Sequence, residues 1–586
     1  QYDQIVHAAL AGHGIALGRL ALIAMSIADR PRPKLVLVRS PLGRQMFGFV
    51  WLPRDELTTA RRVAIGEMIA DSAGGTILNW TVAMEDGNTA LIRYTVDLRG
   101  ASGLPDEEAL DAQLEKMVRG WVRDVEVALA ERVASQRAAR LALRWAAAFP
   151  MSYRTVSTPE DAAEDIARLA ELEGAGDRQV NLYPATDAGE RRLKIYKTNG
   201  ALALSDAVPV LENFGFRVIG EWPTRLREEA DSYVHDFTLE AKDADDAVAK
   251  EVLEGAVAAV LKGEAENDEF NRLILDVGLA PDAVVLLRAW FRYMRQAGVS
   301  YGLTTVVDAL ARAPRVTRAL IDRFTLSHKP GATGDAAAIE AAIDAGLEAV
   351  VAIDDDRILR AYRAVIGATL RTNAFADAGR EALAFKLDSS RIPGLPAPLP
   401  WREVWVYSPR VEGIHLRASP VARGGLRWSD RRDDFRTEIL GLMKAQRVKN
   451  AVIVPSGAKG GFYPKQLPSP AVDRDAWLAE GTESYRIFIR TLLSITDNIV
   501  AGKVVHPKGV VIHDADDPYF VVAADKGTAT FSDVANAIAL EHDFWLGDAF
   551  ASGGSQGYDH KAMGITARGA WVSVQRHFAE RGVDVQ

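Results

Sequence analysis

The chain has 586 residues, of which 48% are hydrophobic and 25% are charged, a composition typical of a soluble globular protein with about three to five domains. Its net charge of −9 argues against a nucleic-acid-binding protein. The absence of cysteine excludes disulfides, thiolate zinc sites and cysteine nucleophiles, and it favours a reducing, cytoplasmic location.

The most apolar N-terminal stretch, "AALAGHGIALGRLALIAMSIA", is interrupted by His13 and Arg19. Its uncharged runs are shorter than the roughly 18 residues that a membrane-spanning helix needs. It also lacks the cleavage site of a signal peptide. We therefore expect no membrane segment.

Residues 1–100 are predicted to hold a small α+β module. The strand-like segments "KLVLVR" and "MFGFVWLP" precede a helical pattern, and "TILNWTVAME" and "TALIRYTVDL" follow as a hairpin. Residues 101–185 are predicted to form a helical connector. The β-α-β-β order recurs in a second module predicted at 186–260, and this order indicates two ferredoxin-like folds.

Alanine-rich helices are predicted for residues 261–386. The following segment, 387–400, contains four prolines, and it is predicted to be a linker between domains because proline favours extended or turning backbone. Residues 401–586 are predicted to form an α/β domain that carries the chemistry.

Residues 401–470 contain 13 Lys and Arg against 6 Asp and Glu, and this local excess of positive charge indicates an anionic ligand. Arg423 directly precedes Gly424 and Gly425. Paired glycines let a backbone approach a ligand, and an arginine can fork onto a carboxylate or phosphate. The alternative is a Gly-Gly turn in a solvated basic face, and this motif alone does not distinguish the two interpretations.

The segment 429–450 is predicted to be a helix capped by Ser429, with acidic residues in its first turn. Lys444 and Lys449 lie toward its C-terminal end. Each of these lysines either binds an anion or simply favours the helix dipole.

A strand predicted at 451–454 ends in the loop "PSGAKGG", which presents Lys459. The loop is not a P-loop, because Lys459 is followed by glycine rather than Ser or Thr. Burial among small residues and near other cations favours the neutral form of an amine, which can then act as a base. The alternative is a solvated turn.

Asp525 directly follows the apolar run "YFVVAA", and strand ends are where α/β enzymes place polar groups; the alternative is a helix cap. The segment "SGGSQG" lacks the G-x-G-x-x-G spacing, and we expect no strand before it, so it is not a dinucleotide fingerprint. A helix is predicted to begin near Thr566. The histidines show no metal-binding spacing, so no metal is expected.

Four motifs in this order, "RGGLRWS", "VKNAVIVPSGAKGGF", "AADKGTATFSD" and "GITARGAW", resemble the substrate domain of glutamate dehydrogenases. The resemblance is to the large NAD-dependent bacterial class, and it is most specific over residues 385–586. Residues 1–385 are similar to the N-terminal region of that class. The resemblance implies an α/β and α+β multidomain fold, in which ACT-like (ferredoxin-like) modules and helical segments precede the substrate domain.

The resemblance also implies roles for individual residues. Arg423, with Gly424, would hold the side-chain carboxylate of glutamate, where the small enzymes of the family use lysine. Lys449 would hold the α-carboxylate, with Lys444 as its substitute. Two further residues would act on protons: Lys459 as the base that activates water, and Asp525 as the acid that exchanges a proton with the amino nitrogen. Thr566 would contact the nicotinamide amide.

The implied reaction is the reversible, NAD-dependent oxidative deamination of L-glutamate to 2-oxoglutarate and ammonia in a homo-oligomer, with amino-acid effectors at the ACT-like modules. The chain departs from the class because it has no nucleotide-binding glycine fingerprint, so we expect a central fragment of a longer enzyme. Two alternatives remain: a non-catalytic amino-acid sensor, and a dehydrogenase for another amino acid, which would replace one carboxylate-binding cation by an apolar residue.

Overall fold

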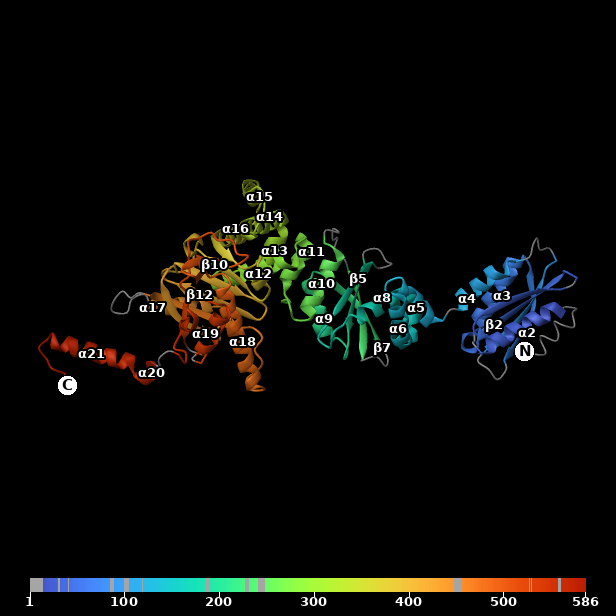
Figure 1. Cartoon of the computed structure of the whole chain (residues 1–586). Coiled ribbons are helices and arrows are strands. Elements are labelled where there is room, and N and C mark those ends of the chain that lie inside the picture. Colours follow the sequence, from blue (N-terminus) through green and yellow to red (C-terminus); the bar gives the residue numbers. More distant parts are fainter. Residues whose placement is uncertain are drawn as a thin grey trace. The chain divides into compact units, whose positions relative to one another are not determined.

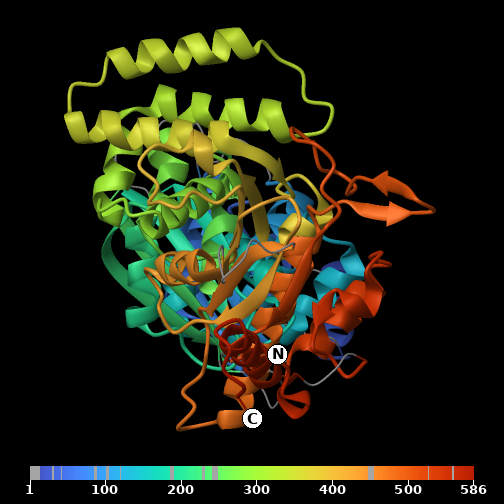
Figure 2. The same cartoon turned by 90° about the vertical axis from the view of Figure 1, so that its left-hand side faces the viewer.

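The computed structural model describes residues 14–29, 32–40, 42–84, 89–99, 105–118, 120–184, 190–226, 231–240, 248–446, 455–525, 527–528, 530–556 and 560–585. The chain divides into two units, residues 1–173, 196–201 and 223–234 in the first and the remainder in the second. Figures 1 and 2 show its elements coloured in chain order. In the described ranges, no helix is both long and apolar enough to cross a membrane.

The first module is a four-stranded antiparallel sheet in the order β1-β2-β4-β3, with helices on both faces. Its elements are α2 (Gly14–Asp29), β1 (Lys34–Arg39), β2 (Gln45–Pro53), η1 (Arg54–Glu56), α3 (Thr59–Ala73), β3 (Thr76–Met84), β4 (Thr89–Asp97) and α4 (Glu107–Val118). Residues of β2 alternate between the two faces, so Phe49 packs with Leu20 of α2 while Val50 packs with Ile65 of α3. The predicted strands, helix and hairpin are confirmed.

The second module repeats this strand order as β5-β6-β8-β7. Its elements are β5 (Gln179–Pro184), β6 (Glu190–Lys197), α9 (Leu204–Asn213), β7 (Arg217–Leu226), β8 (Ser232–Glu240) and α10 (Lys250–Leu261). The helices between the modules are α5 (Trp121–Ala130), α6 (Ser135–Trp145), η2 (Ala146–Ala148), α7 (Met151–Val156) and α8 (Pro159–Leu169). Both modules run ββαββα along the chain, which is a circular permutation of the ferredoxin-like βαββαβ order. β5 lies ahead of the start predicted at residue 186.

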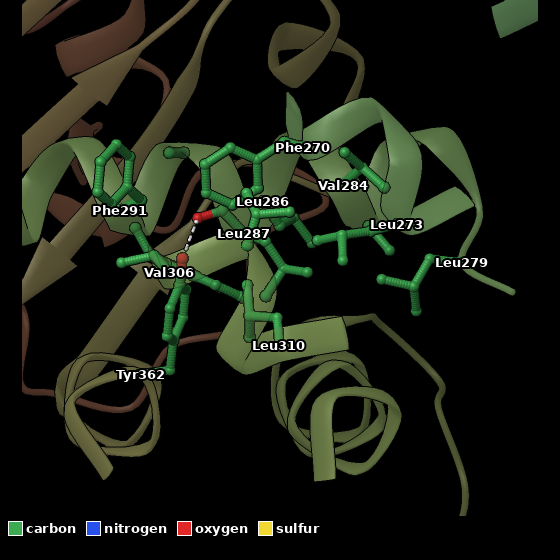
Figure 3. Close-up of a cluster of buried hydrophobic side chains, with 14 of the residues drawn as sticks. Phe270, Leu273, Leu279, Val284, Leu286, Leu287, Phe291, Val306, Leu310 and Tyr362 are labelled. Atoms are coloured by element: carbon green, nitrogen blue, oxygen red, sulfur yellow. Dashed lines mark hydrogen bonds between the residues drawn. The ribbon is translucent and has the colours of Figure 1, made fainter. Parts of the chain in front are cut away.

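A bundle of helices follows, as predicted. It contains η3 (Glu269–Arg272), α11 (Leu273–Val277), α12 (Pro281–Gln296), α13 (Leu303–Arg312), α14 (Pro314–His328), α15 (Ala336–Glu348) and α16 (Ile353–Ala368). Figure 3 shows its core, in which Phe270, Leu310 and Val306 pack around α12. The hydroxyl of Tyr362 donates a hydrogen bond of 3.0 Å to the carbonyl of Leu287, so α16 is fastened to α12.

A sheet of eight strands follows, in the order β18-β17-β13-β14-β12-β11-β10-β9. Its strands are β9 (Thr369–Thr372), β10 (Leu383–Leu387), β11 (Arg402–Tyr407), β12 (Val411–Arg417), β13 (Ala422–Trp428), β14 (Ser456–Pro464), β17 (Val521–Ala524) and β18 (Ala551–Ser552). The other elements of this region are η4 (Asp377–Arg380), η5 (Ser389–Arg391), α17 (Phe435–Gln446), α18 (Arg474–Leu493), β15 (Asn498–Val500), β16 (Lys503–Val505), α19 (Ser532–Glu541), η6 (Gly547–Ala549), α20 (His560–Met563) and α21 (Ile565–Ala579).

The helical region predicted to reach residue 386 in fact ends at Ala368, because β9 and β10 follow and belong to the eight-stranded sheet. β10 pairs antiparallel with β11. The proline-rich segment 387–400 therefore connects two neighbouring strands of one sheet, so the prediction of a linker between domains is wrong. Its prolines fit this connection, because a residue outside the strands need not donate a backbone N–H hydrogen bond to a neighbouring strand.

Strand alternation sends neighbouring side chains to opposite faces of the sheet. Trp405 and Phe435 of α17 belong to a cluster shared with the helical bundle, whereas Val406 and Phe462 pack with Phe488 of α18. One face is thus covered by α17 and the other by α18. The strand pairs β13–β14 and β17–β18 are parallel and are connected through α17 and α19.

Candidate active site

Lys459 lies in the middle of β14, on the face that α17 covers. A Cβ added at Gly457 would come within 2.9 Å of Gln446, and one added at Gly461 within 2.6 Å of Ile439, both of α17. The glycines of "SGAKGG" therefore let α17 lie against the strand. The prediction that these residues form a loop is wrong, and the strand predicted at 451–454 lies outside the described residues.

Lys459 and Asp525 form a salt bridge. Lys459 Nζ lies 2.6 Å from Asp525 Oδ2, and Lys459 is only 7% exposed. Asp525 directly follows β17, as predicted, and its backbone N–H donates to the hydroxyl of Thr528 at 3.0 Å. The structure thus brings together the two residues predicted to act on protons, in a place where water has little access.

Arg427 belongs to the same cluster and was not identified from the sequence. Its guanidinium contacts Oδ1 of Asp525 at 3.4 Å and Oε1 of Glu438 at 2.8 Å, while Ser429 donates to Glu438 at 2.9 Å. Burial lowers the pKa of Arg427, but the contacts with Glu438 and Asp525 raise it overall. The alternation of "RGGLR" is the signal that could have found it, because Arg423, Gly425 and Arg427 share one face of β13.

The two glycines after Arg423 have different surroundings. A Cβ on Gly425 would lie 3.0 Å from the Cβ of Asp525 and 3.2 Å from Lys459 Nζ, whereas one on Gly424 would lie 1.5 Å from the carbonyl oxygen of Ala458. Gly425 therefore lines the Lys459–Asp525 pair. Gly424 allows β13 and β14 to approach each other, and its predicted role in substrate binding stays a prediction. Both lie within a strand, so the alternative of a Gly-Gly turn is also wrong.

Arg423 and Lys444 are exposed, and neither has an ion-pair partner in the part of the chain that the structure describes. Arg423 shares the face of β13 with Arg427, and Lys444 lies in the last turn of α17. Both therefore remain free to bind a carboxylate.

The helix predicted to start after Ser429 begins only at Phe435, so Ser429 does not cap it and the aspartates before residue 435 lie outside its first turn. Lys449 lies outside the described residues. Thr566 is the second residue of α21, near the predicted helix start, but its side chain is not among those described. The two-residue strand β18 precedes "SGGSQG", where no strand was expected.

Within this site, a buried amine and a carboxylate are in direct hydrogen-bond contact, and further cations lie on the same side of the sheet. Such a pair can pass a proton between its members and to a bound molecule. Fold and site together define a class of chain in which two ferredoxin-like modules precede an eight-stranded sheet that carries a buried lysine–carboxylate pair.

Comparisons with known proteins agree with this class. Residues 342–586 match the catalytic domain of bacterial NAD-glutamate dehydrogenase. The preceding matches are to glutamate dehydrogenase domains: the ACT2 domain at 34–122, helical motif 2 at 128–172, the ACT3 domain at 177–252 and helical motif 3 at 265–330. The catalytic match begins well before residue 401, in agreement with the position of β9 and β10. The chain belongs to the bacterial NAD-glutamate dehydrogenase family.

Three relatives named NAD-specific glutamate dehydrogenase match 97% of the chain. Those of Pseudomonas aeruginosa and Halomonas elongata are each 43% identical over 585 residues, and that of Mycobacterium tuberculosis is 42% identical over 612 residues. The chain spans 36%, 36% and 37% of their lengths, so it corresponds to little more than a third of these relatives.

Proposed function

We propose that this chain supplies the substrate site and regulatory modules of an enzyme that oxidatively deaminates L-glutamate to 2-oxoglutarate and ammonia with NAD. The observation that carries the proposal is the contact of 2.6 Å between Lys459 and Asp525 in a buried site. Transfer of the shared proton to Asp525 leaves a neutral amine on Lys459. That amine can take a proton from water as it adds to the C=N carbon of the oxidised substrate.

Asp525 then returns a proton to the substrate nitrogen, which leaves as ammonia. Arg423 would bind the side-chain carboxylate, and Lys449 or Lys444 the α-carboxylate, because a dicarboxylate needs two separated cations. NAD supplies the hydride acceptor when it is bound. Neither parallel βαβ unit of the eight-stranded sheet carries the G-x-G-x-x-G pattern. Thr566 would contact the nicotinamide amide.

The test of this proposal is Lys459→Ala in the protein at its natural length. We expect NAD-dependent turnover of glutamate to fall by about 10²- to 10⁴-fold, the usual contribution of a general base. Lys503→Ala is the matched control, because Lys503 is an exposed lysine of β16. Glutamate binding to the 586-residue chain, measured by calorimetry, should change little in either variant. Near-normal turnover of Lys459→Ala would remove the proposed base.

The two ACT matches support a second function, the binding of amino-acid effectors. A non-catalytic sensor would bind glutamate at these modules alone. Arg423→Ala separates the two functions, because it removes only the carboxylate ligand of the catalytic sheet. A large loss of glutamate affinity favours the enzyme, and unchanged affinity favours the sensor.

We also propose that the protein is a cytoplasmic homo-oligomer. The lack of cysteine supports the compartment. Exposed tryptophans on the edge strands of both modules, Trp80 of β3 and Trp222 of β7, support self-association. Sedimentation velocity of the natural-length protein tests this point, and a monomer at micromolar concentration would contradict it.

A further inference from the structure

A cavity of about 170 Å³ lies between α14, α15, α16 and the β9 edge of the catalytic sheet. Figure 2 shows these helices in yellow-green and yellow at the top of the view. Four strand spacings separate β9 from β14, which places the cavity roughly 20 Å from Lys459. It is therefore separate from the candidate active site.

The lining of the cavity is strongly cationic. It contains three arginines, Arg323, Arg363 and Arg391, and a single carboxylate, Glu340. Glu340 already accepts hydrogen bonds from Arg323 at 2.7 Å and from Arg363 at 2.8 Å. Burial raises the pKa of Glu340, but these two hydrogen bonds lower it overall, so the carboxylate stays ionised.

Donor capacity remains after these contacts. Each guanidinium carries five N–H donors. Glu340 occupies one nitrogen of Arg323 and one of Arg363, while Arg323 also donates to Ser327 and Arg363 to Asp344 at 2.6 Å, so some of these donors remain. Arg391 is exposed, and no hydrogen bond or ion pair engages its guanidinium within the described ranges. Glu340 and Asp344 together balance Arg323 and Arg363, so Arg391 brings the cavity a positive charge that neither carboxylate neutralises.

A buried histidine completes the wall. His328 is only 2% exposed, and its Nδ1 has no hydrogen-bond partner within the described residues. Its ring contacts that of His513, whose Nε2 donates to the carbonyl of Ser327 at 2.8 Å. An unpaired buried ring nitrogen is unfavourable, and in the tautomer that carries the proton on Nδ1 it would donate a hydrogen bond to an oxyanion in the cavity.

We propose that this cavity, which we call the α14–α16 pocket, binds a small oxyanion, either phosphate or a short carboxylate. Planar guanidinium forks match both groups. The volume corresponds to roughly five or six water molecules at about 30 Å³ each, which suits an anion of that size rather than a nucleotide.

The pocket is also connected to the catalytic sheet. His513 is followed by Asp514, which forms ion pairs with Arg371 of β9 at 2.5 Å and with Lys386 of β10 at 2.6 Å. An anion held between Arg391 and the helices would thus restrain both the bundle and the segment that leads to Asp525. The binding proposal itself does not depend on the proposed reaction.

Calorimetry of the 586-residue chain with sodium phosphate, and separately with sodium malonate, tests the proposal at constant ionic strength with chloride as the reference. We expect one of the two anions, or both, to bind at millimolar or lower concentration. Arg391→Gln should weaken this binding by about tenfold or more, since a charge-assisted hydrogen bond is lost. Arg315→Gln, an exposed arginine of α14 outside the pocket, should bind as the unaltered chain does.

The result with each anion identifies the ligand, because binding of phosphate alone or of malonate alone assigns the pocket to that chemistry. Absence of binding by both anions, or equal affinity in Arg391→Gln and the unaltered chain, would overturn the proposal. Since Arg391 makes no internal ion pair within the described residues, its substitution should leave the thermal unfolding temperature without ligand unchanged. This control separates loss of the ligand from loss of the fold.

Discussion

The Cα of Gly425 lies directly against the amine of Lys459, so closely that a methyl group built on it would come within 3.2 Å of Nζ. The same methyl group would lie 2.8 Å from the carbonyl oxygen of Ala524. Gly425 thus leaves the space in which Lys459 and Asp525 meet. Glycine is required here because a side chain would not fit. The backbone conformation does not require it, because the φ of Gly425 does not lie in the left-handed region.

Gly425→Ala should lower turnover of glutamate by at least about tenfold, because displacement of reacting groups by a fraction of an ångström is costly. Gly441→Ala is the matched control, since a Cβ at this helical position meets nothing within 4 Å. Steady-state kinetics of both variants, with circular dichroism to confirm folding, measures the effect. Equal turnover of Gly425→Ala and the unaltered protein would show that the pair tolerates displacement.

Arg427→Met should lower kcat by about tenfold and change the KM for glutamate much less, because Arg427 positions Asp525 and is not proposed to bind substrate. The acid limb of the pH–rate profile should move toward neutral pH, since a carboxylate that loses a cationic neighbour protonates more readily. Arg427→Lys should restore part of the rate. Arg431→Met is the control, because Arg431 pairs with exposed Asp434. An unmoved pH profile would assign Arg427 a structural role alone.

Local pattern was enough to predict the two modules, apart from β5, and the position of Asp525. Alternating β-branched and aromatic residues mark β1, β2 and β4 in the sequence, and a polar residue that follows a short apolar run marks the end of β17. These signals depend on a few neighbouring residues. These patterns can therefore be recognised in the sequence without knowing which elements pack on the strands.

The nature of β14 and the role of Arg427 depend on distant partners. Glycine is depleted in strands, so "SGAKGG" looks like a loop until α17 is seen to need the space above Gly457 and Gly461. Arg427 becomes a site residue only because Asp525, 98 positions later, lies beside it. For the same reason β9 and β10 looked like the end of a helical region, since their pairing partners lie outside the local window.

Arg371→Met should destabilise the catalytic sheet by about 3–5 kcal/mol, the usual cost of breaking a buried ion pair. Arg371 and Asp497 are both fully buried, and their side chains meet at 2.7 Å. Hydrogen exchange of the peptides that cover residues 497–520 measures the local free energy of opening. Arg380→Met, which alters an exposed arginine, should have no measurable effect. A loss of less than about 1 kcal/mol would show that the pair is no stronger than a surface salt bridge.

The Arg371 effect should shrink in acid. Burial raises the pKa of Asp497, but hydrogen bonds from Arg371, from the N–H of Asp517 and from His506 lower it overall. Its contribution to stability is therefore present above the ordinary aspartate pKa of about 4 and is lost as the pH falls through the lower folded value. Exchange measured below about pH 4 should show a smaller difference between the variant and the unaltered chain.

His415→Phe should make the catalytic sheet less sensitive to mild acid. His415 is 1% exposed on β12, neither ring nitrogen has a hydrogen-bond partner within the described residues, and its ring packs on Phe520 at 4.6 Å. Burial, with a smaller effect of Arg417, lowers its pKa to about 3, while Asp517 acts in the opposite direction. The folded state therefore holds this ring neutral at pH values where an unfolded chain protonates it.

The direction of the pH effect on stability follows from the difference in the pKa of His415 between the folded and unfolded states. Between about pH 6.5 and 3, His415 binds a proton in the unfolded state but not in the folded state. The free energy of unfolding therefore decreases as the pH falls, by about 2 kcal/mol at pH 5. The variant should lack this loss and gain that much relative to the unaltered chain between pH 8 and pH 5. Hydrogen exchange of β12, with His577→Phe on exposed α21 as the control, measures the difference. A parallel pH dependence in His415→Phe and the unaltered chain would mean that water reaches and protonates His415 in the folded state.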